Sequence, residues 1–225
     1  MMQLSVIVPL LNEKAQLPEL LEHLHALQGH GCEILLVDGG SDDHSPEIAR
    51  SLGFTVLDSA RGRAAQMNVG ARAAQGDMLL FLHADTRLPT FADVLIRVAL
   101  MHQRHVWGYF AVYIQGKPPL LRVIAKLMNW RSRLSGVATG DQALFMKRTA
   151  FASVGGFPEQ PLMEDIEMSR RLRRLSRPAF LAQRVITSGR RWESHGVWKT
   201  VFLMWRLRLA YWWGVPAEVL AGHYR

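Results

Sequence analysis

A histidine and an aspartate, two residues apart, follow an apolar segment near the middle of the chain. Residues 78–82 read MLLFL, which predicts a buried strand that ends at His83-Ala84-Asp85. Because side chains alternate along an extended chain, His83 and Asp85 can face one crevice beyond the strand. Imidazole and carboxylate groups are ligands for Mn²⁺ or Mg²⁺. The alternative is that Asp85 caps the next helix and His83 packs in the core.

Two earlier strands also end in polar and small residues. The segment 4–10 is followed by Asn12-Glu13, and the segment 33–37 by Asp38-Gly39-Gly40. The carboxyl ends of neighbouring parallel strands meet at one edge of a sheet, where ligands bind. Gly40 would let the backbone approach such a ligand closely. The alternative is a tight turn that leads into a helix cap.

The composition indicates a globular protein with more basic than acidic residues. The 225 residues are 49% hydrophobic and carry a formal net charge of +8, which indicates an anionic partner such as phosphate, nucleic acid or acidic lipid. Cys32 stands alone, so no internal disulfide forms and a reducing compartment is expected. We expect no signal peptide and no membrane-spanning segment, hence a cytoplasmic protein. Dinucleotide and P-loop signatures are missing.

The order of elements predicts an α/β fold with a mainly parallel, Rossmann-like sheet flanked by helices. Strands and helices alternate through the first 85 residues, and the second half is less regular. There the patterns predict a strand at 107–114, taken to be antiparallel, and helices at 91–101, 118–134, 164–175 and 197–213. Shorter strands are expected at 143–147 and 180–186, with a helical turn at 149–154. No pattern in the tail, residues 214–225, predicts a helix or a strand.

Several motifs, taken together and in order, resemble family 2 glycosyltransferases. They are the segments SVIVPLLNE at 5–13, VDGGSDD at 37–43 and LFLHADT at 80–86, followed by Gly155-Gly156-Phe157 and Glu164-Asp165. The resemblance covers roughly residues 4–192. The Asp-Gly-Gly-Ser motif and the segment RGRAAQMN at 61–68 look most like the small bacterial single-domain members.

This resemblance implies a GT-A fold in one domain. Residues 1–88 would form the nucleotide-sugar-binding half, 89–192 the acceptor and catalytic half with a small antiparallel portion, and 193–225 a C-terminal amphipathic helix and tail. A nucleotide-diphosphate sugar is the implied donor, and a divalent metal, Mn²⁺ or Mg²⁺, the implied cofactor.

The resemblance also implies roles for individual residues. Asp165 would be the general base, beside Glu164, and Asp85 with His83 would hold the metal. The donor would be bound by residues near the strand ends and the third helix: Pro9, Asn12, Glu13, Asp38, Gly40, Arg63, Asn68, His83 and Ala84. Chemistry supports this: a leaving diphosphate needs a cation, and an acceptor hydroxyl needs a carboxylate to take its proton. Helix-dipole compensation is the alternative for Glu164-Asp165.

Two residues depart from the family pattern. Gly39 stands where many members carry a second acid, and His83 replaces the first aspartate of the DxD motif. A neutral imidazole binds Mn²⁺ but supplies no negative charge. A catalytically degenerate domain that binds a nucleotide or glycan without turnover is therefore the alternative function.

Acceptor-side candidates follow in the second half. They are Asp141 and Gln142, which precede a strand, and Arg191 and Trp192, which resemble the end of the QxxRW motif. Ser188 occupies the glutamine position of that motif, so processivity is not inferred. Turn capping and a solvated basic loop are the respective alternatives.

An aromatic stripe marks the last predicted helix. Trp205 and Trp212 lie on it at helical spacing, with Arg206 and Arg208 nearby. Core packing is one interpretation. The other is a peripheral contact with an anionic membrane surface, toward a lipid-linked acceptor. No nucleic-acid partner is expected, since no recognisable binding motif is present.

Overall fold

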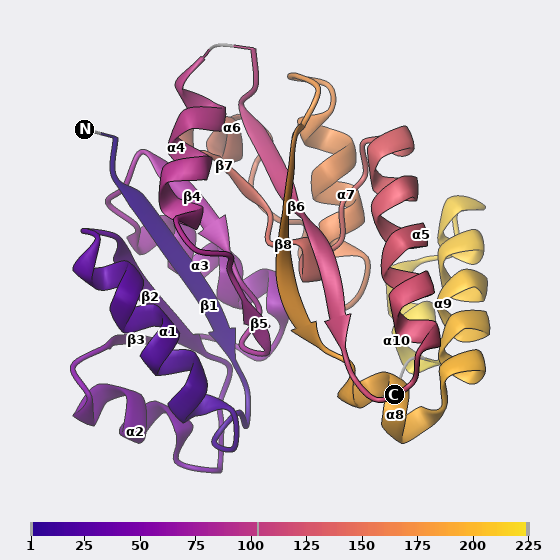
Figure 1. Cartoon of the computed structure of the whole chain (residues 1–225), viewed down its shortest axis with the longest axis horizontal. Coiled ribbons are helices and arrows are strands. Elements are labelled where there is room, and N and C mark those ends of the chain that lie inside the picture. The colour runs from indigo at the N-terminus through magenta and orange to yellow at the C-terminus, as the bar shows by residue number, and fades with distance from the viewer. Residues whose placement is uncertain (1, 103, 224–225) are drawn as a thin grey trace.

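The strands lie where the apolar and β-branched segments predicted them. The computed structural model describes residues 2–102 and 104–223, and within these residues eight strands form one sheet (Figure 1). The strands are β1 (Leu4–Leu10), β2 (Glu33–Asp38), β3 (Thr55–Asp58), β4 (Met78–Phe81), β5 (Thr86–Arg87), β6 (Trp107–Gln115), β7 (Phe145–Lys147) and β8 (Ala179–Ser188). Their order across the sheet is β3-β2-β1-β4-β7-β6-β8-β5.

Most neighbours in this sheet are parallel. Strands β3, β2, β1 and β4 run parallel, and so do β6 and β8. The predicted antiparallel character of β6 needs correction: β6 is antiparallel only to β7, which is itself antiparallel to β4. The short strand β7 is thus the element that reverses direction, and β5 is antiparallel to β8 at the edge.

The predicted helices are confirmed, with ends that differ by a few residues. The helices are α1 (Leu17–Gly29), α2 (Ser45–Ser51), α3 (Arg63–Ala73), α4 (Ala92–Met101), α5 (Leu120–Ser135), α6 (Arg148–Ser153), α7 (Glu164–Leu172), α8 (Arg190–His195), α9 (Val197–Trp212) and α10 (Ala217–Gly222), with a 3₁₀ turn η1 (Gly140–Gln142). The elements that the patterns did not predict are short: β5, η1, α8 and α10.

Apolar side chains cover both faces of the sheet. On one face, alternate residues of β1 such as Val6 and Val8 pack with the leucines of α1 and with buried residues of α4 and α5. On the other face, Ile7 and Val37 pack with α3, α6 and α7. Helices α9 and α10 add a small third cluster, in which Leu207 and Leu220 meet Met163 just before α7. Parallel strands buried on both faces explain the continuous apolar runs in the sequence.

Gly70 is the position at which α3 lies nearest to the sheet. A Cβ there would stand 2.5 Å from Cγ2 of Ile7 and 3.0 Å from Cγ2 of Val37. We expect Gly70→Ala to lower the free energy of unfolding by about 1–3 kcal/mol, because overpacking outweighs the helix propensity of alanine. Urea denaturation measures this. Gly29→Ala, in the last turn of α1 with open space around it, is the matched control and should cost nothing; equal losses in both variants would contradict this account.

Candidate active site

The loops after β1 and β2 are bonded to each other. Asn12, at φ +55°, accepts a hydrogen bond from the Asp42 N–H through Oδ1 at 2.9 Å, and its own N–H donates to Oγ of Ser41 at 2.9 Å. The Glu13 N–H donates to Oγ of Ser45 at 3.1 Å. The predicted donor-binding residue Asn12 thus joins two loops, and this junction fixes the place of Glu13.

The Asp38 side chain accepts hydrogen bonds from the turn that follows it. The side chain is 5% exposed, and Oδ2 accepts hydrogen bonds from the N–H groups of Gly40 at 2.9 Å and Ser41 at 3.0 Å. Oδ1 accepts from Oγ of Ser41 at 2.5 Å. Gly40 has φ +85°, a conformation that glycine adopts without strain. The turn interpretation of Asp38-Gly39-Gly40 therefore describes the observed contacts, and donor contact by Asp38 stays a prediction.

Gln66, on α3, is a residue that sequence reasoning missed. Its Nε2 donates to the carbonyl oxygens of Leu10 and Val37, both at 2.7 Å, and so ties together the ends of β1 and β2. A Cβ at Gly39 would lie 3.0 Å from the Gln66 side chain. The glycine that departs from the family pattern therefore leaves room for this amide. Pro9 lies beside Val37 in the same strand pair.

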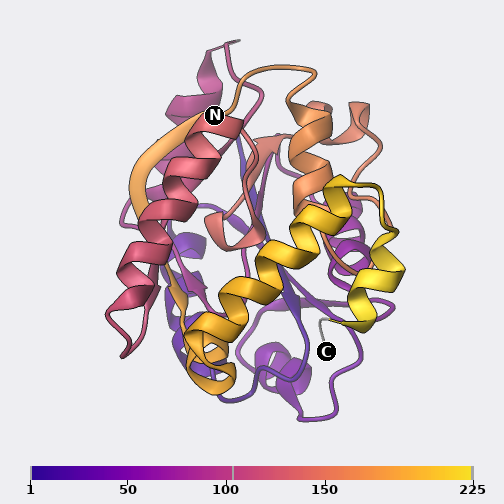
Figure 2. The same cartoon turned by 90° about the vertical axis from the view of Figure 1, so that its right-hand side faces the viewer.

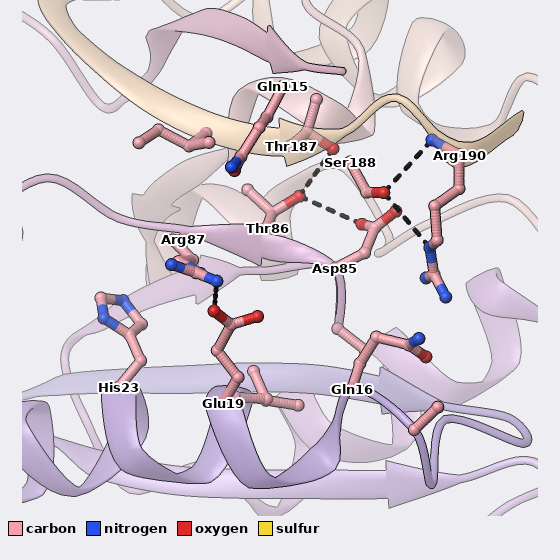
Figure 3. Close-up of a pocket in the computed structure, with 14 residues that line it drawn as sticks. Gln16, Glu19, His23, Asp85, Thr86, Arg87, Gln115, Thr187, Ser188 and Arg190 are labelled. Carbon is pink, nitrogen blue, oxygen red and sulfur yellow. Dashed lines mark hydrogen bonds and ion pairs between the residues drawn. The ribbon is translucent and has the colours of Figure 1, made fainter. Parts of the chain in front are cut away.

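A pocket of about 370 Å³ opens between α1 and the strands β5 and β8 (Figure 3). Asp85 and Arg190 line it, and Thr86 Oγ1 donates to Asp85 Oδ1 at 3.3 Å. Arg190 Nε donates to Oγ of Ser188 at 3.2 Å. The pocket thus holds a carboxylate opposite a guanidinium group, the pair that a metal-bound anion would need.

Glu13 connects this pocket to the first loop. Its Oε2 lies 3.8 Å from the nearest guanidinium nitrogen of Arg190. Burial raises the pKa of Glu13 and the charge of Asp85 adds to this, while Arg190 and Arg63 oppose it. Glu13 is therefore close enough to Asp85 for the charge of Asp85 to act on it, and donor binding by Glu13 stays a prediction.

A second group of side chains gathers around η1. Nδ1 of His83 lies 3.4 Å from Oδ1 of Asp141. A Cβ at Gly140 would lie 2.4 Å from Nε2 of His83, so the imidazole packs directly on this glycine. The Gly140 N–H donates to Oδ2 of Asp165 at 2.7 Å, and the Ile166 N–H donates to its Oδ1 at 2.7 Å.

Burial and charge shift the acids of this group in opposite directions. Burial raises the pKa of both Glu164 and Asp165, which lie side by side in the first turn of α7. Burial also works against ionisation of Asp141, but the hydrogen bond and charge of His83, with help from Arg63 and Arg131, hold its pKa below the ordinary value. The site therefore combines one readily ionised acid with two that retain protons to higher pH.

Arg131, on α5, is the second residue that the sequence did not reveal. Burial lowers its pKa, and the charges of Asp165, Tyr109 and Asp141 oppose this. Its Nε is buried without a hydrogen-bond partner. Nothing in the α5 sequence distinguishes this arginine from its neighbours, because its orientation depends on how α5 packs on β6.

Three predicted site residues, Asn68, Gln142 and Trp192, are held by contacts within the protein. Asn68 exchanges two hydrogen bonds, both 2.9 Å, with the backbone of Phe157. Gln142 is fully buried, and its side chain bonds to Ser132, Thr139 and the backbone of β6. Trp192 packs against the core beside α5, and Arg191 is half-buried. We therefore do not include Asn68, Gln142 or Trp192 in the proposed site.

Arg63 links the two groups. Its charge acts on Glu13 on one side and on Asp141 and Glu164 on the other. His83 and Asp85, which were predicted to face one crevice, have different partners: His83 contacts Asp141, and Asp85 faces the pocket of Figure 3. The backbone between them turns, as the bond from the Thr86 N–H to the His83 carbonyl shows.

The side chains of this site suit a metal ion that takes most of its ligands from substrate phosphates and water. Across residues 2–102 and 104–223, no three His, Cys, Asp or Glu side chains are grouped so as to hold an ion. Mg²⁺ is commonly bound by one or two carboxylates, with substrate phosphates and water completing the shell. The half-buried carboxylate of Asp85, in the pocket with Arg190, fits that arrangement.

No helix in the described ranges has the length and apolarity to cross a bilayer.

Comparison with known proteins places the chain in a family. The model of glycosyl transferase family 2 matches residues 5–150, well over half of the sequence, so the chain belongs to this family. An uncharacterized glycosyltransferase of Haemophilus influenzae is 41% identical over 85 residues, which are 36% of this chain and 29% of that protein. The undecaprenyl-phosphate 4-deoxy-4-formamido-L-arabinose transferase of Pseudomonas aeruginosa is 30% identical over 145 residues, 60% and 40% of the two chains. The matches thus span less than half of these relatives.

Solved structures show the same fold. TarS of S. aureus, residues 1–349, superposes with a TM-score of 0.65 at 18% identity, over 84% of this chain and 61% of that one. The mannosyltransferase PcManGT of Pyrobaculum calidifontis, solved with GDP-Man and Mn²⁺, gives 0.63 at 20% identity, over 92% and 60%. The fold is therefore GT-A: a curled, mostly parallel sheet with helices on both faces.

The raised pKa values have a consequence for stability. A carboxylate whose pKa is raised by folding binds its proton more tightly in the native state, so stability falls as pH rises from the unfolded pKa through the folded one. We expect Glu164→Gln to remove part of this fall and to stabilise the protein at pH 7–8 relative to wild type, because burial raises the pKa of Glu164. The gain should vanish well below the ordinary pKa of 4.5, where wild-type Glu164 is protonated in both the folded and the unfolded state. Thermal melts across pH measure this. Glu22→Gln, exposed on α1, should leave the profile unchanged.

Proposed function

We propose that the chain transfers a sugar from a nucleotide-diphosphate donor to an acceptor hydroxyl, with inversion at the anomeric carbon. The observation that carries this proposal is the position of the Asp165 carboxylate, which two backbone N–H groups bind. Two backbone N–H groups fix its plane, and each oxygen keeps a lone pair free for a further contact. Burial raises its pKa, which makes it a stronger base than an exposed aspartate.

In the proposed reaction, the acceptor oxygen attacks the anomeric carbon while Asp165 takes the hydroxyl proton. The bond from that carbon to the donor phosphate breaks, and the diphosphate leaves with the bonding electrons. Arg63, whose charge acts on both groups of acids, and Arg190, beside Glu13, supply positive charge. A divalent cation held by Asp85 and the diphosphate would neutralise negative charge that develops on the leaving group. A single displacement by one base accounts for inversion.

His83, in this proposal, is a positioning residue and not a metal ligand. Its Nδ1 is directed at Asp141 and its ring rests on Gly140, whose N–H holds Asp165. The imidazole therefore supports the turn that orients the base. This assignment accounts for the histidine in the DxD position without requiring it to bind a cation.

We further propose a lipid-linked acceptor, with the enzyme at the cytoplasmic face of a membrane. The relative from Pseudomonas aeruginosa that acts on undecaprenyl-phosphate supports such an acceptor. The basic helix α9 supports membrane contact, because Lys199 and Arg206 lie exposed beside its aromatic stripe.

The base assignment has a direct test. Asp165→Asn keeps an oxygen for one backbone bond but cannot accept a proton, so transfer should fall roughly 10²–10⁴-fold. Binding of the donor nucleotide should stay within a few-fold of wild type. Turnover of a panel of nucleotide sugars, followed as nucleotide diphosphate released, measures the first quantity. Full activity in Asp165→Asn would refute the assignment, and wild type that binds donors without turnover would favour the degenerate domain.

The metal assignment separates Asp85 from His83. UDP or GDP should raise the melting temperature of wild type more with Mn²⁺ than with EDTA, because a ligand bound only by the native state stabilises it. Asp85→Asn should lose this Mn²⁺-dependent increment, and His83→Ala should retain it while transfer slows. The opposite pattern, with the increment lost only in His83→Ala, would make the imidazole the ligand.

A further inference from the structure

Two helices on one side of the molecule expose apolar stripes. On α5 the stripe is Val123, Leu127, Trp130 and Leu134, between 48% and 69% exposed. On α9 it is Trp198, Phe202, Trp205, Leu209 and Trp212, between 48% and 76% exposed. Both sets are spaced by three or four residues, so each forms a single line along its helix. No protein element in the described ranges covers either line.

The opposite sides of both helices pack inward. Ile124 and Ala125 of α5 belong to the large core cluster, and Val197 and Val201 at the start of α9 pack against that same cluster. Figures 1 and 2 show α5 and α9 on the same side of the molecule, away from α1 to α3. The two helices that carry the stripes therefore lie on one side of the molecule, which we call the α5/α9 face.

The charge of this face has one sign. Helices α5 and α9 have 16 residues each and contain no Asp or Glu. They contain seven basic residues: Arg122, Lys126, Arg131, Arg133, Lys199, Arg206 and Arg208. The formal net charge of the whole chain is +8, so these two helices account for nearly all of it. All but Arg131 and Arg208 are exposed.

We propose that the α5/α9 face docks on an anionic lipid bilayer, with both helices lying in the plane of its surface. Exposed Trp and Leu side chains then enter the boundary between headgroups and acyl chains, and Lys and Arg side chains beside them contact anionic headgroups. A basic residue near such a surface strengthens binding roughly fivefold. A second copy of the chain fits this face poorly, because a symmetric contact would set its positive charges against those of the partner.

Docking in this orientation brings the bilayer to the catalytic side. Arg131, on α5, acts on Asp165 and Asp141. On α9, Leu203 and Leu207 pack with Met163 and Ile166, which flank the acid pair at the start of α7. Both membrane-facing helices thus back directly onto residues at or next to the proposed base, so an acceptor that stays anchored in the bilayer has a short path to it.

Co-sedimentation with vesicles tests the docking without any turnover. Wild type should bind vesicles of phosphatidylcholine with 30% phosphatidylglycerol, and binding should weaken at least tenfold in pure phosphatidylcholine or at high salt. Leu127→Ser/Trp130→Ser on α5 and Trp205→Ser/Trp212→Ser on α9 should each lower binding at least tenfold, with unchanged melting temperatures. Val94→Ser/Val98→Ser on α4, which removes two exposed apolar residues (47% and 52%) from another helix, is the control and should bind as wild type does.

Several outcomes would overturn the proposal. It fails if wild type does not bind the anionic vesicles, or if the α4 variant loses as much binding as the α5 variant. It also fails if wild type is a dimer that the α5 or α9 substitutions dissociate, since the face would then be an interface between copies. The docking does not depend on sugar transfer, and Asp165→Asn should sediment with vesicles as wild type does. Wild type that binds vesicles but transfers no sugar would reject only the proposed function.

Discussion

The hydrogen bond from the Gly140 N–H to Asp165 depends on the absence of a side chain at residue 140. A Cβ there would lie 2.4 Å from Nε2 of His83, so either the imidazole or the turn η1 would have to move. A glycine and an imidazole from two separate segments are thus stacked beside the acid pair of α7. Burial disfavours the charged form of Glu164 and Asp165, and this stack, with Arg63 and Arg131 around it, supplies the partners that make ionisation possible.

The donor side of the molecule is built by a different means. Side chains of Asn12, Asp38 and Gln66 bond almost entirely to backbone groups of neighbouring loops and strands. Polar residues that read as ligand contacts in the sequence therefore serve as internal supports. Asp85 and Arg190 line the pocket, and Glu13 lies 3.8 Å from Arg190. Preorganised loops of this kind hold a few charged groups in place at small cost in chain entropy.

The sequence predicted the sheet and nearly all longer helices because apolar periodicity is a local signal. It also predicted that the acids after β1, β2 and β4 and those at the start of α7 would share one pocket, which stays a prediction. What it could not predict depends on packing at a distance. Gln66 and Arg131 are ordinary helix residues until α3 and α5 are placed, and Gln142 looks like a loop residue until the surrounding core encloses it. The short strand β5 has only two residues, too few for any periodicity.

The sheet order carries a consequence for how the molecule moves. Strands β4 and β5 are separated by four residues in the chain, yet four strand spacings, about 19 Å on a flat sheet, lie between them. Five residue steps reach at most about 18 Å when fully extended, and this segment turns at His83. The sheet must therefore curl so that its two sides approach each other. The segment from His83 to Arg87 crosses from β4 to β8, where β5 pairs with β8 and the Thr86 hydroxyl donates to that of Thr187. This short connection holds the two sides of the curled sheet together, which opposes a hinge motion between them and leaves loops and side chains as the parts that can move around a ligand.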